Sequence, residues 1–540
     1  MGTVSDRMMT RRHFLELVGY LGGASVALGG LKALGLKAAE PTTQRGAGKF
    51  ELRGNGRGRT VLILGAGISG MCAAYELGKV GYDCRILEAR TRTGGRCHTI
   101  RRDTVETETD GRTQSCTFDD GQYFNPGPAR IAQHHVTLDY CRELGVAIEQ
   151  FGNQNEAAFL YRQRPGALSG RRVRFREARS DLYGYVAELL AKAVNQKALD
   201  QVLSPEDKRA LLQYLAHEGG LAMNMTYRGS DRRGFRTWPG AAEAHGEQDD
   251  PFTLHEILQS ELGKEFAFNW TIHQQATMFQ IVGGMDRLAQ AFERRLGPDI
   301  ELGARVTEIR QTPTSVEVLY TDRLGRPQQA SAEFCICTIP LPVLKHIPAN
   351  FSEKMTRAIA AGELVPATKV GLQFKRRFWE EDDGIFAGIS RTDQSITQIM
   401  YPSNGFLGSK GVLVGCYNFG AGAEELGRLT PQQRMERTLA EGSKIHPQYA
   451  SEFESGFSVA WEKTPYSLGA FTAHSPHEAG NHYQTLCEPD GRVYLAGEHV
   501  SQLSGWIAGA LESARHTARL IHDRAHRETV PTTPTSGATR

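Results

Sequence analysis

The stretch Gly65-Ala66-Gly67-Ile68-Ser69-Gly70 is a G-x-G-x-x-G motif, and it decides the fold of this chain. The apolar run before it, residues 59–64, lacks alternation, which is typical of a strand buried on both faces in a parallel sheet. Residues 71–80 then place apolar side chains at helical spacing, and residues 85–88 predict the next strand. The motif therefore lies at the turn of a βαβ unit of about 30 residues, a unit that can bind a dinucleotide.

The glycines of this motif have separate predicted roles. Gly65 permits the tight turn, Gly67 lets the backbone approach a pyrophosphate at the helix N-terminus, and Gly70 allows helix and strand to pack closely. Glu88 ends the second strand, where a carboxylate can accept hydrogen bonds from ribose hydroxyls. Because strand, helix and acid all fall at the required spacing, we expect a dinucleotide site rather than a Gly-rich packing turn.

The composition is that of a globular protein with several domains. A length of 540 residues suggests about three domains, and the balance of 23% charged and 40% hydrophobic residues excludes a wholly disordered chain. The net charge of +2 shows no basic excess, so nucleic acid is not an expected partner. Nine scattered cysteines do not form a disulfide framework, and Cys335 and Cys337, within an apolar run, favour strand packing over metal binding.

The remaining patterns predict a mixed α/β architecture with a helical insertion. Residues 182–194 carry one apolar face, and Ser204 followed by Pro205 is typical of a helix N-cap and first helical position. Further predicted elements are a helix at 285–296, a strand at 315–320 with a turn at 323–327 and a return strand at 333–338, strands at 369–375, 411–417 and 492–496, and a helix at 505–523.

The N-terminus resembles a twin-arginine export signal. Thr10-Arg11-Arg12-His13-Phe14-Leu15 precedes a Gly- and Ala-rich, mildly apolar stretch that ends near Leu36. A transmembrane anchor is the alternative, but several glycines and Lys32 interrupt the stretch. No A-x-A site stands out near residues 37–39, so cleavage stays open. We expect an exported protein, periplasmic or extracellular rather than cytoplasmic, without a stable membrane span.

Four further segments resemble the amine oxidase superfamily of FAD flavoproteins. They are Glu88 to Arg96, similar to the family's E-A-x-x-x-x-G-G-R, Gly303 to Ile309, Val493 to His499, and Ser504 to Ala514, and they occur in family order. The resemblance implies FAD as cofactor. It places the cofactor contacts at Gly65, Gly67, Ile68, Ser69, Gly70, Glu88, Ala89, Gly95, Arg96, Gly127, Ala129, Arg130, Val306, Glu498, Trp506, Ile507 and Ala510.

Within that superfamily, Tyr123 to Arg130 is similar to the G-P-M-R segment of L-amino acid oxidases, most closely the bacterial ones. The resemblance implies that Arg130 grips the substrate α-carboxylate, which a true amine oxidase has no need to bind. Tyr417, at the end of a predicted strand, is the preferred second carboxylate contact, and Tyr401 is its rival.

The same resemblance assigns the rest of the substrate end. Lys369 falls on the family lysine that reaches the flavin through a water molecule. Gly505, Trp506 and Phe471 are expected beside the flavin, where the Trp506 wall and the Gly505 carbonyl help to place the amine. Ala470 occupies the position at which monoamine oxidases carry a cysteine bonded to FAD, so FAD is expected to be non-covalent.

The implied reaction is oxidative deamination of an L-amino acid by hydride transfer to the flavin. It gives a 2-oxo acid, ammonium and H2O2, with O2 as acceptor. The alternatives are an amine oxidase, an amino acid 2-monooxygenase of the same fold, and a flavin protein without catalysis. A homodimer is common in the family, although nothing in the sequence shows one.

The implied architecture is a discontinuous Rossmann-like FAD domain (59–105, 276–345 and 485–525), a substrate domain with a mixed β-sheet (106–170 and 346–484) and a helical domain (171–275). The flanking segments are the signal (1–39), a linker (40–58) and a disordered tail (526–540). No metal site is expected: His474, His477 and His482 fall in a loop-like stretch, and neither His134 nor His135 suggests more.

Overall fold

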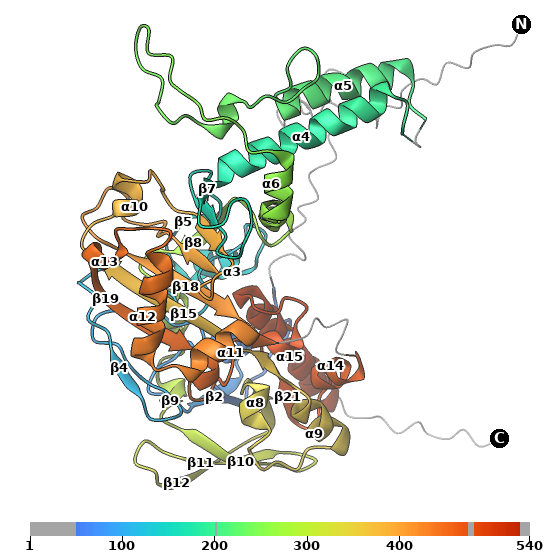
Figure 1. Ribbon diagram of the computed structural model, residues 1–540. Helices are drawn as coiled ribbons and strands as arrows, with labels where there is room; N and C mark the ends of the chain where they lie inside the picture. Colours follow the sequence, from blue (N-terminus) through green and yellow to red (C-terminus); the bar gives the residue numbers. More distant parts are fainter. Residues whose placement is uncertain (1–49, 200–201, 473–479, 530–540) are drawn as a thin grey trace, which may run out of the picture. The chain divides into compact units, whose positions relative to one another are not determined.

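The computed structural model describes residues 50–199, 202–472 and 480–529. The larger unit of the chain starts at Glu51 and holds the elements described below (Figure 1). The predicted export signal, His474 and His477 lie outside the described residues. Within those residues, no helix combines the length and the apolar character needed to cross a membrane.

A five-stranded parallel sheet forms the first layer, as predicted from the Gly-rich motif. Its order is β21 (Val493–Leu495), β13 (Phe334–Cys337), β1 (Thr60–Leu64), β2 (Asp83–Glu88) and β9 (Ile300–Leu302), and every neighbouring pair runs parallel. The strands are short, apolar and mostly buried on both faces, as the lack of alternation indicates.

Helices cover one face of this sheet and a small antiparallel sheet covers the other. On the first face, α2 (Ile68–Gly78), α7 (Arg287–Leu296) and α15 (Ile507–Thr529) share one hydrophobic core with β1 and β2. The second face packs on the three-stranded sheet β10 (Arg305–Gln311), β11 (Val316–Thr321) and β12 (Pro327–Ala332). The layers match the predicted Rossmann-like architecture.

A seven-stranded mixed sheet forms a second body of strands. In order it contains β19 (Phe453–Ala460), β15 (Ala367–Phe374), β18 (Gly411–Phe419), β17 (Gln398–Met400), β16 (Ile389–Thr392), β6 (Phe159–Tyr161) and β7 (Arg172–Arg174). Only β16 and β6 run parallel; the other neighbours are antiparallel. Helices α11 (Ala421–Arg428) and α12 (Pro431–Gly442) pack against β15, β18 and β19.

The helical insertion is led by two long helices, α4 (Phe175–Asn195) and α5 (Pro205–Gly219), which pack side by side (Figure 1). Ser204 caps α5 as predicted, because its Oγ accepts a hydrogen bond from the backbone N–H of Asp207 at 3.0 Å.

The other elements are β3 (Val105–Thr107), β4 (Thr113–Ser115), α3 (Thr137–Leu144), β5 (Ile148–Gly152), the 3₁₀ helices η1 (Asp231–Arg233), η2 (Leu262–Trp270), η3 (Gly297–Asp299), η4 (Trp461–Lys463) and η5 (Glu498–Val500), α6 (Leu254–Gln259), β8 (Thr277–Ile281), α8 (Leu341–Leu344), α9 (Glu353–Ala360), β14 (Leu364–Val365), α10 (Phe378–Glu381), α13 (Tyr449–Glu452), β20 (Phe471–Thr472) and α14 (Gly480–Cys487).

One predicted strand pairing is wrong. The partner of β11 is β12, whereas residues 334–337, expected as the return strand, form β13 in the parallel sheet. The sequence of β12 is polar and starts with proline, so it lacks the apolar pattern by which a strand is recognised. Proline is tolerated here because β12 lies at the edge of its sheet. The all-apolar sequence of β13 instead suits a strand buried on both faces, where Cys335 and Cys337 pack as expected.

Three segment boundaries also differ from the expected ones. Residues 51–58, expected within the linker, belong to the larger unit, and the N–H of Gly56 donates to the Val80 carbonyl at 2.7 Å. Strand β7 adds the first residues of the expected helical segment to the seven-stranded sheet. Helix α15 begins two positions after Gly505 and continues to Thr529, inside the expected tail.

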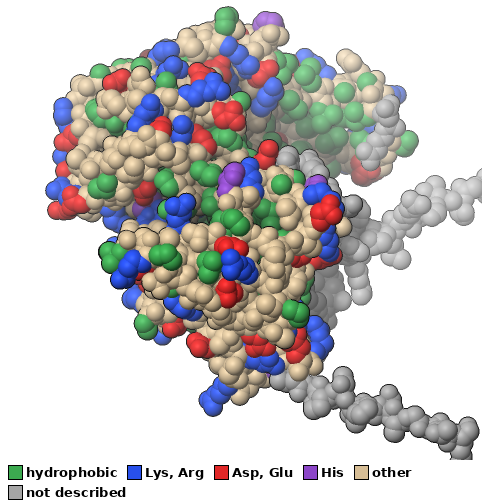
Figure 2. All heavy atoms as spheres, turned by 90° about the horizontal axis from the view of Figure 1, so that it is seen from below, with side chains coloured by type: hydrophobic (Ala, Val, Ile, Leu, Met, Phe, Trp, Pro, Cys, Tyr) green, Lys and Arg blue, Asp and Glu red, His purple; other side chains and the backbone are tan. Residues whose placement is uncertain are grey.

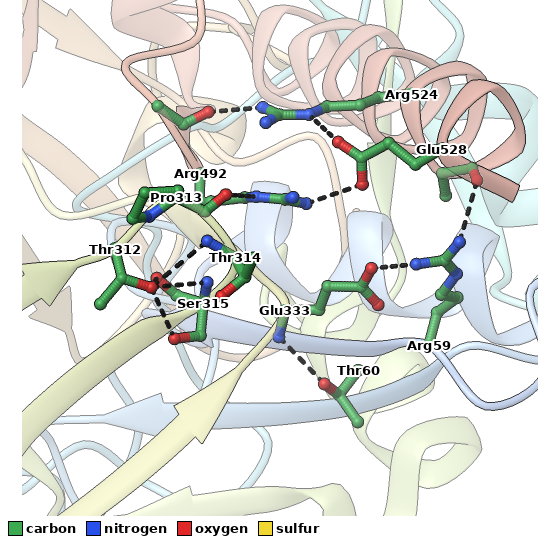
Figure 3. A network of polar contacts seen from close by, with 12 residues as sticks. Arg59, Thr60, Thr312, Pro313, Thr314, Ser315, Glu333, Arg492, Arg524 and Glu528 are labelled. Carbon is green, nitrogen blue, oxygen red and sulfur yellow. Dashed lines mark hydrogen bonds and ion pairs between the residues drawn. The ribbon is translucent and has the colours of Figure 1, made fainter. Parts of the chain in front are cut away.

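Ionic contacts lie at the amino ends of the parallel strands (Figure 3). Arg59, before β1, pairs with Glu333, before β13, and also donates to the Ala525 carbonyl of α15 at 3.1 Å. Arg492, before β21, pairs with Glu528 of α15 at 3.0 Å. On the face seen in Figure 2, basic and acidic side chains are interspersed, in keeping with the small net charge. The opposite, carboxyl ends of the strands are left for the cavity described next.

Candidate active site

A cavity of about 1120 Å³ opens at the carboxyl ends of β1, β2 and β13. Its lining comes from the Gly-rich turn, the segments that follow β2 and β13, the N-terminus of α15, and strands β15 and β18 of the seven-stranded sheet. Ligands in α/β folds bind at this edge of the sheet. The cavity is large enough for a ligand beyond the size of a typical metabolite.

The Gly-rich turn forms one part of this cavity as the motif predicts. Gly67 has open space where a side chain would project, and α2 starts directly after it, so the first backbone N–H groups of the helix lie beside the cavity. A Cβ on Gly70 would instead lie 2.1 Å from the Gly65 carbonyl oxygen. Gly70 therefore serves helix–strand packing and does not line the cavity, unlike the other motif residues predicted to touch the cofactor.

Glu88 is buried at the end of β2 and is held by backbone donors. One carboxylate oxygen accepts from the N–H of Ala66 and the other from the N–H of Arg90, both at 2.8 Å. Each oxygen keeps a further lone pair, so the carboxylate stays available to a hydroxyl in the cavity. The turn and the acid are thus fixed relative to each other.

Arg96 and Glu498 connect two of the segments predicted to bind the cofactor, one near each end of the chain. Arg96 Nη1 donates to Glu498 Oε1 at 2.9 Å and to the Ala470 carbonyl at 2.8 Å. The other oxygen of Glu498 accepts from the hydroxyls of Thr472 and Ser504. Burial by itself would raise the pKa of Glu498, but the charges of Arg96 and His499 and the hydrogen bonds from Arg96 and the Thr472 backbone outweigh it and hold the pKa below its usual value.

Lys369 and Tyr417 face each other on neighbouring strands of the seven-stranded sheet. They are register partners in the β15–β18 ladder, and Lys369 Nζ lies 4.3 Å from the centroid of the Tyr417 ring. Nζ donates to the carbonyl oxygens of Gly127 at 2.6 Å and Asn125 at 3.2 Å. Burial and the nearby charge of Arg130 lower the pKa of Lys369 to about 7.

Arg130 is the cation at this part of the cavity. Its Nε donates to Gln274 Oε1 at 3.1 Å, and among the described residues it forms no ion pair with a carboxylate. Burial lowers the pKa of Arg130 to about 10, a value at which the guanidinium is still charged at neutral pH, while burial raises the pKa of Tyr417. A half-buried guanidinium without a carboxylate partner, near the Tyr417 side chain, is suited to an anionic ligand group.

An aromatic and small-residue wall completes the site. Gly505, Trp506, Phe471 and Ala470 all line the cavity, and Phe471 is held by β14–β20 pairing with Val365. Ala470, the position at which the resemblance places a cysteine in monoamine oxidases, lines the cavity beside Phe471. The Cys97 thiol also lies at the cavity wall, but it donates to the Met285 carbonyl and burial raises its pKa, so it is not a reactive thiolate.

Comparison with known proteins decides the family. The family model for flavin containing amine oxidoreductases matches residues 68–522. The chain belongs to this family. The Bacillus subtilis (strain 168) protein YobN is 30% identical over 85% of this chain and 93% of its own length. The L-amino-acid oxidases of Bothrops pauloensis and Vipera ammodytes ammodytes are each 27% identical, over 86% and 88% of this chain and 89% and 96% of their own.

Solved structures agree on the fold of the family. Putrescine oxidase bound to putrescine superposes with a TM-score of 0.57 at 17% identity, covering 86% of this chain and 99% of its own. Cyclohexylamine oxidase from Brevibacterium oxydans IH-35A gives a TM-score of 0.58 at 18% identity, covering 87% and 100%. The predicted oxidoreductase class and flavin cofactor are confirmed by the family match.

The cavity of this family member fits FAD. The open space at Gly67, the start of α2 and Arg96 suit a pyrophosphate, and the buried Glu88 suits a ribose. Of the predicted site residues, the structure brings all but Gly70 to this one cavity. Tyr401, the rival of Tyr417, lies elsewhere: it is buried, and its hydroxyl contacts Ser390 and His446.

Several lining residues were not predicted. Thr338 follows β13 at the carboxyl end of a parallel strand, a position that could have been recognised from the strand pattern. Trp461 holds the Pro126 carbonyl through its indole N–H at 2.9 Å, and Gln274 holds Arg130. Neither carries a sequence signal, because each is brought to the site by a segment far away in the chain. His482, on α14, is exposed and does not line the cavity.

Proposed function

We propose that this chain is an FAD-dependent L-amino acid oxidase, which converts an L-amino acid, water and O2 into a 2-oxo acid, ammonium and H2O2. The observation that carries the proposal is Arg130: a half-buried cation at the cavity, without a carboxylate partner among the described residues. A substrate carboxylate would neutralise it, whereas a simple amine would leave it unpaired. The names of the Bothrops and Vipera relatives support the same reaction.

Arg130 and Tyr417 give the substrate its orientation. The guanidinium can bind both carboxylate oxygens, and the Tyr417 hydroxyl can donate to one of them. With the carboxylate fixed, rotation about the Cα–carboxyl bond is restricted by the Trp506 and Phe471 walls. When bound, FAD supplies the two-electron acceptor for the Cα–H bond. The residues around it thus contribute mainly proximity and orientation.

Lys369 positions water in this proposal. A neutral amine has two N–H groups and one lone pair. Its two N–H groups can serve the carbonyls of Gly127 and Asn125, which leaves the lone pair free to accept from a water molecule in the cavity. The lowered pKa, about 7, makes this neutral form common at neutral pH. No side-chain base is required to remove the Cα hydrogen, because the lone pair of the neutral substrate amine drives the transfer of that hydrogen as a hydride.

The decisive experiment replaces Arg130 by methionine. Peroxide release is measured first with the twenty L-amino acids, then with the best substrate and its decarboxylated amine. R130M should lower kcat/KM for the amino acid about 100-fold or more, since a buried charge interaction worth about 3–5 kcal/mol is lost, and it should not worsen turnover of the amine. Arg305, which lines the cavity beside Val306, provides the control variant R305M.

The alternatives predict other products and substrates. If the protein is an amine oxidase, the wild type should turn over the amine, and R130M should not change its kcat/KM. An amino acid 2-monooxygenase would yield an amide and CO2 in place of a 2-oxo acid and H2O2. A flavin protein without catalysis would bind FAD that no amino acid bleaches under anaerobic conditions. Full activity of R130M toward amino acids would reject the carboxylate assignment.

We also propose non-covalent FAD, export by the twin-arginine route and assembly as a homodimer. Non-covalent FAD is supported by Ala470 and should be released by acid precipitation. Export is supported by Arg11 and Arg12, and replacing both by lysine should retain the protein in the cytoplasm of a bacterial host. The dimer is supported only by family resemblance and is tested by light scattering of the FAD-loaded protein.

A further inference from the structure

Three histidine side chains meet beside the cavity wall. His134 and His135 precede α3, and His273 lies between η2 and β8. The Nδ1 atom of His273 is 3.1 Å from Nε2 of His134 and 3.1 Å from Nε2 of His135. One ring nitrogen from each residue lies within 4.8 Å of the other two. No sequence pattern indicates this cluster, because His273 is 138 residues away from His135.

The backbone holds the two segments of this cluster in place. Ile131 and Phe279 exchange two backbone hydrogen bonds, from the Ile131 N–H at 2.7 Å and from the Phe279 N–H at 2.9 Å. The side-chain amide of Gln133 donates to the Thr277 carbonyl at 3.1 Å. The histidines therefore stand on two paired segments, and their approach does not depend on the side chains alone.

Hydrogen bonding among the three rings satisfies them poorly. A neutral imidazole has one N–H donor and one nitrogen lone pair. His273 Nδ1 faces both Nε2 atoms, yet it can donate to only one of them, or offer its single lone pair to two donors. A cation at the centre would instead accept a lone pair from each ring. Tetrahedral Zn²⁺ with bonds of about 2.0–2.1 Å separates its ligand nitrogens by about 3.3 Å. The two pairs that include His273 Nδ1 lie close to this separation, at 3.1 Å each.

The surroundings allow an open coordination position. The His135 side chain is buried beside the cavity wall, and neutral imidazole is the form that binds metals. The His134 side chain is exposed, so water can reach a fourth position. Three nitrogen ligands favour Zn²⁺, Cu²⁺ or Ni²⁺ over Mg²⁺ or Ca²⁺.

We propose that His134, His135 and His273 bind one divalent transition-metal ion of the Zn²⁺ class. The metal site does not depend on the proposed reaction, but it adjoins residues that the proposed reaction uses. The His135 ring packs edge-on against Trp506 with centroids 4.8 Å apart, and the His273 ring lies 5.9 Å from it. Gln274, next to His273, holds Arg130. A bound ion ties the Arg130 segment to the Gln274 segment, so metal occupancy restrains Trp506 and Arg130 from outside the cavity.

The test measures metal binding by the FAD-loaded protein. The protein is stripped with a chelator, dialysed against Zn²⁺ and analysed for zinc content, and its affinity is measured by calorimetry. We expect one Zn²⁺ per chain and a rise in Tm on Zn²⁺ addition, because a ligand that binds only the folded state stabilises it. H134A and H273A should each weaken binding about 10- to 100-fold or more, since a lost ligand costs at least as much as a lost outer partner.

The exposed His255, on α6 and outside the cluster, supplies the control variant H255A, which should bind zinc like the wild type. The flavin absorption spectrum and the metal-free Tm verify that each variant folds. The proposal is overturned if the wild type binds no zinc, or if H134A and H273A keep wild-type affinity and the Zn²⁺-induced rise in Tm. In either case the three rings serve only as aromatic packing around Trp506.

Discussion

Arg96 and Glu498 form an ion pair with 2.9 Å between Nη1 and Oε1, although 402 residues separate them in the chain. Arg96 lies in the segment that follows β2, and Glu498 begins η5, shortly after β21. The pair therefore fastens together the two motif segments that surround the cofactor cavity. Both side chains are largely buried, at 20% and 9% side-chain exposure, so the loss of either charge leaves the other poorly solvated.

Replacing Glu498 by glutamine should destabilise the protein and weaken FAD binding. The amide keeps the size of the side chain but leaves the Arg96 charge uncompensated, a change that costs about 3–5 kcal/mol for a buried pair. Thermal unfolding and release of flavin fluorescence measure the two effects. E308Q is the control, because the Glu308–Arg310 pair is much more exposed, at 31% and 53% side-chain exposure, and should contribute little to stability. Equal Tm values for E498Q and E308Q would contradict the role of the pair.

Tyr417→Phe and Tyr401→Phe should have opposite signatures. Y417F removes a hydroxyl at the cavity, so KM for the amino acid should rise about 10- to 100-fold, since hydrogen bonds to charged groups contribute about 1.5–3 kcal/mol. Y401F removes buried contacts to Ser390 and His446 and should lower Tm with KM unchanged. Steady-state kinetics and thermal unfolding of both variants measure this. The assignment fails if the KM effect follows Tyr401.

Lys369→Met should change how stability depends on pH. Lys369 has a pKa of about 7 in the folded protein, against about 10.4 for an exposed lysine. Between these values the unfolded chain binds a proton that the folded chain does not, so this group makes stability increase as the pH rises from about 7 to about 10. K369M lacks the group, so its Tm relative to wild type should be highest near pH 7 and fall toward pH 10. A difference in Tm that stays constant across this range would show that the lysine is charged in the folded state.

Alanine at Gly67 and alanine at Gly70 should fail for different reasons. A Cβ at Gly67 points into open space, so G67A should fold like the wild type but bind FAD at least tenfold more weakly, because the methyl group occupies the cavity. A Cβ at Gly70 would lie 2.1 Å from the Gly65 carbonyl, so G70A should unfold at lower temperature even without FAD. Circular dichroism melts and flavin titration separate the two. A G67A variant with wild-type flavin affinity would remove this turn from the cofactor site.

Local patterns predicted those parts of the fold that a single segment can specify. The unbroken apolar run of β1 predicted a strand of a parallel sheet, and the fixed glycine spacing predicted the turn after it. Both can be recognised because buried strands and helix starts have characteristic residue patterns. The polar strand β12 has no such pattern. Its pairing with β11 follows from the short turn between them and from packing on the larger sheet, so the expected hairpin partner was wrong.

The sequence by itself determined the family, the flavin cofactor and the residues Arg130, Lys369 and Tyr417 as candidates, since each stands in a motif or on a recognisable strand. Only the tertiary structure decided which candidates meet. It placed Tyr417 opposite Lys369 in the ladder, removed Tyr401 from the cavity and brought Gln274 to Arg130 across 144 residues. Local periodicity indicates which face of a segment is buried. It does not indicate the partner of that face, because the partner depends on how the whole chain packs.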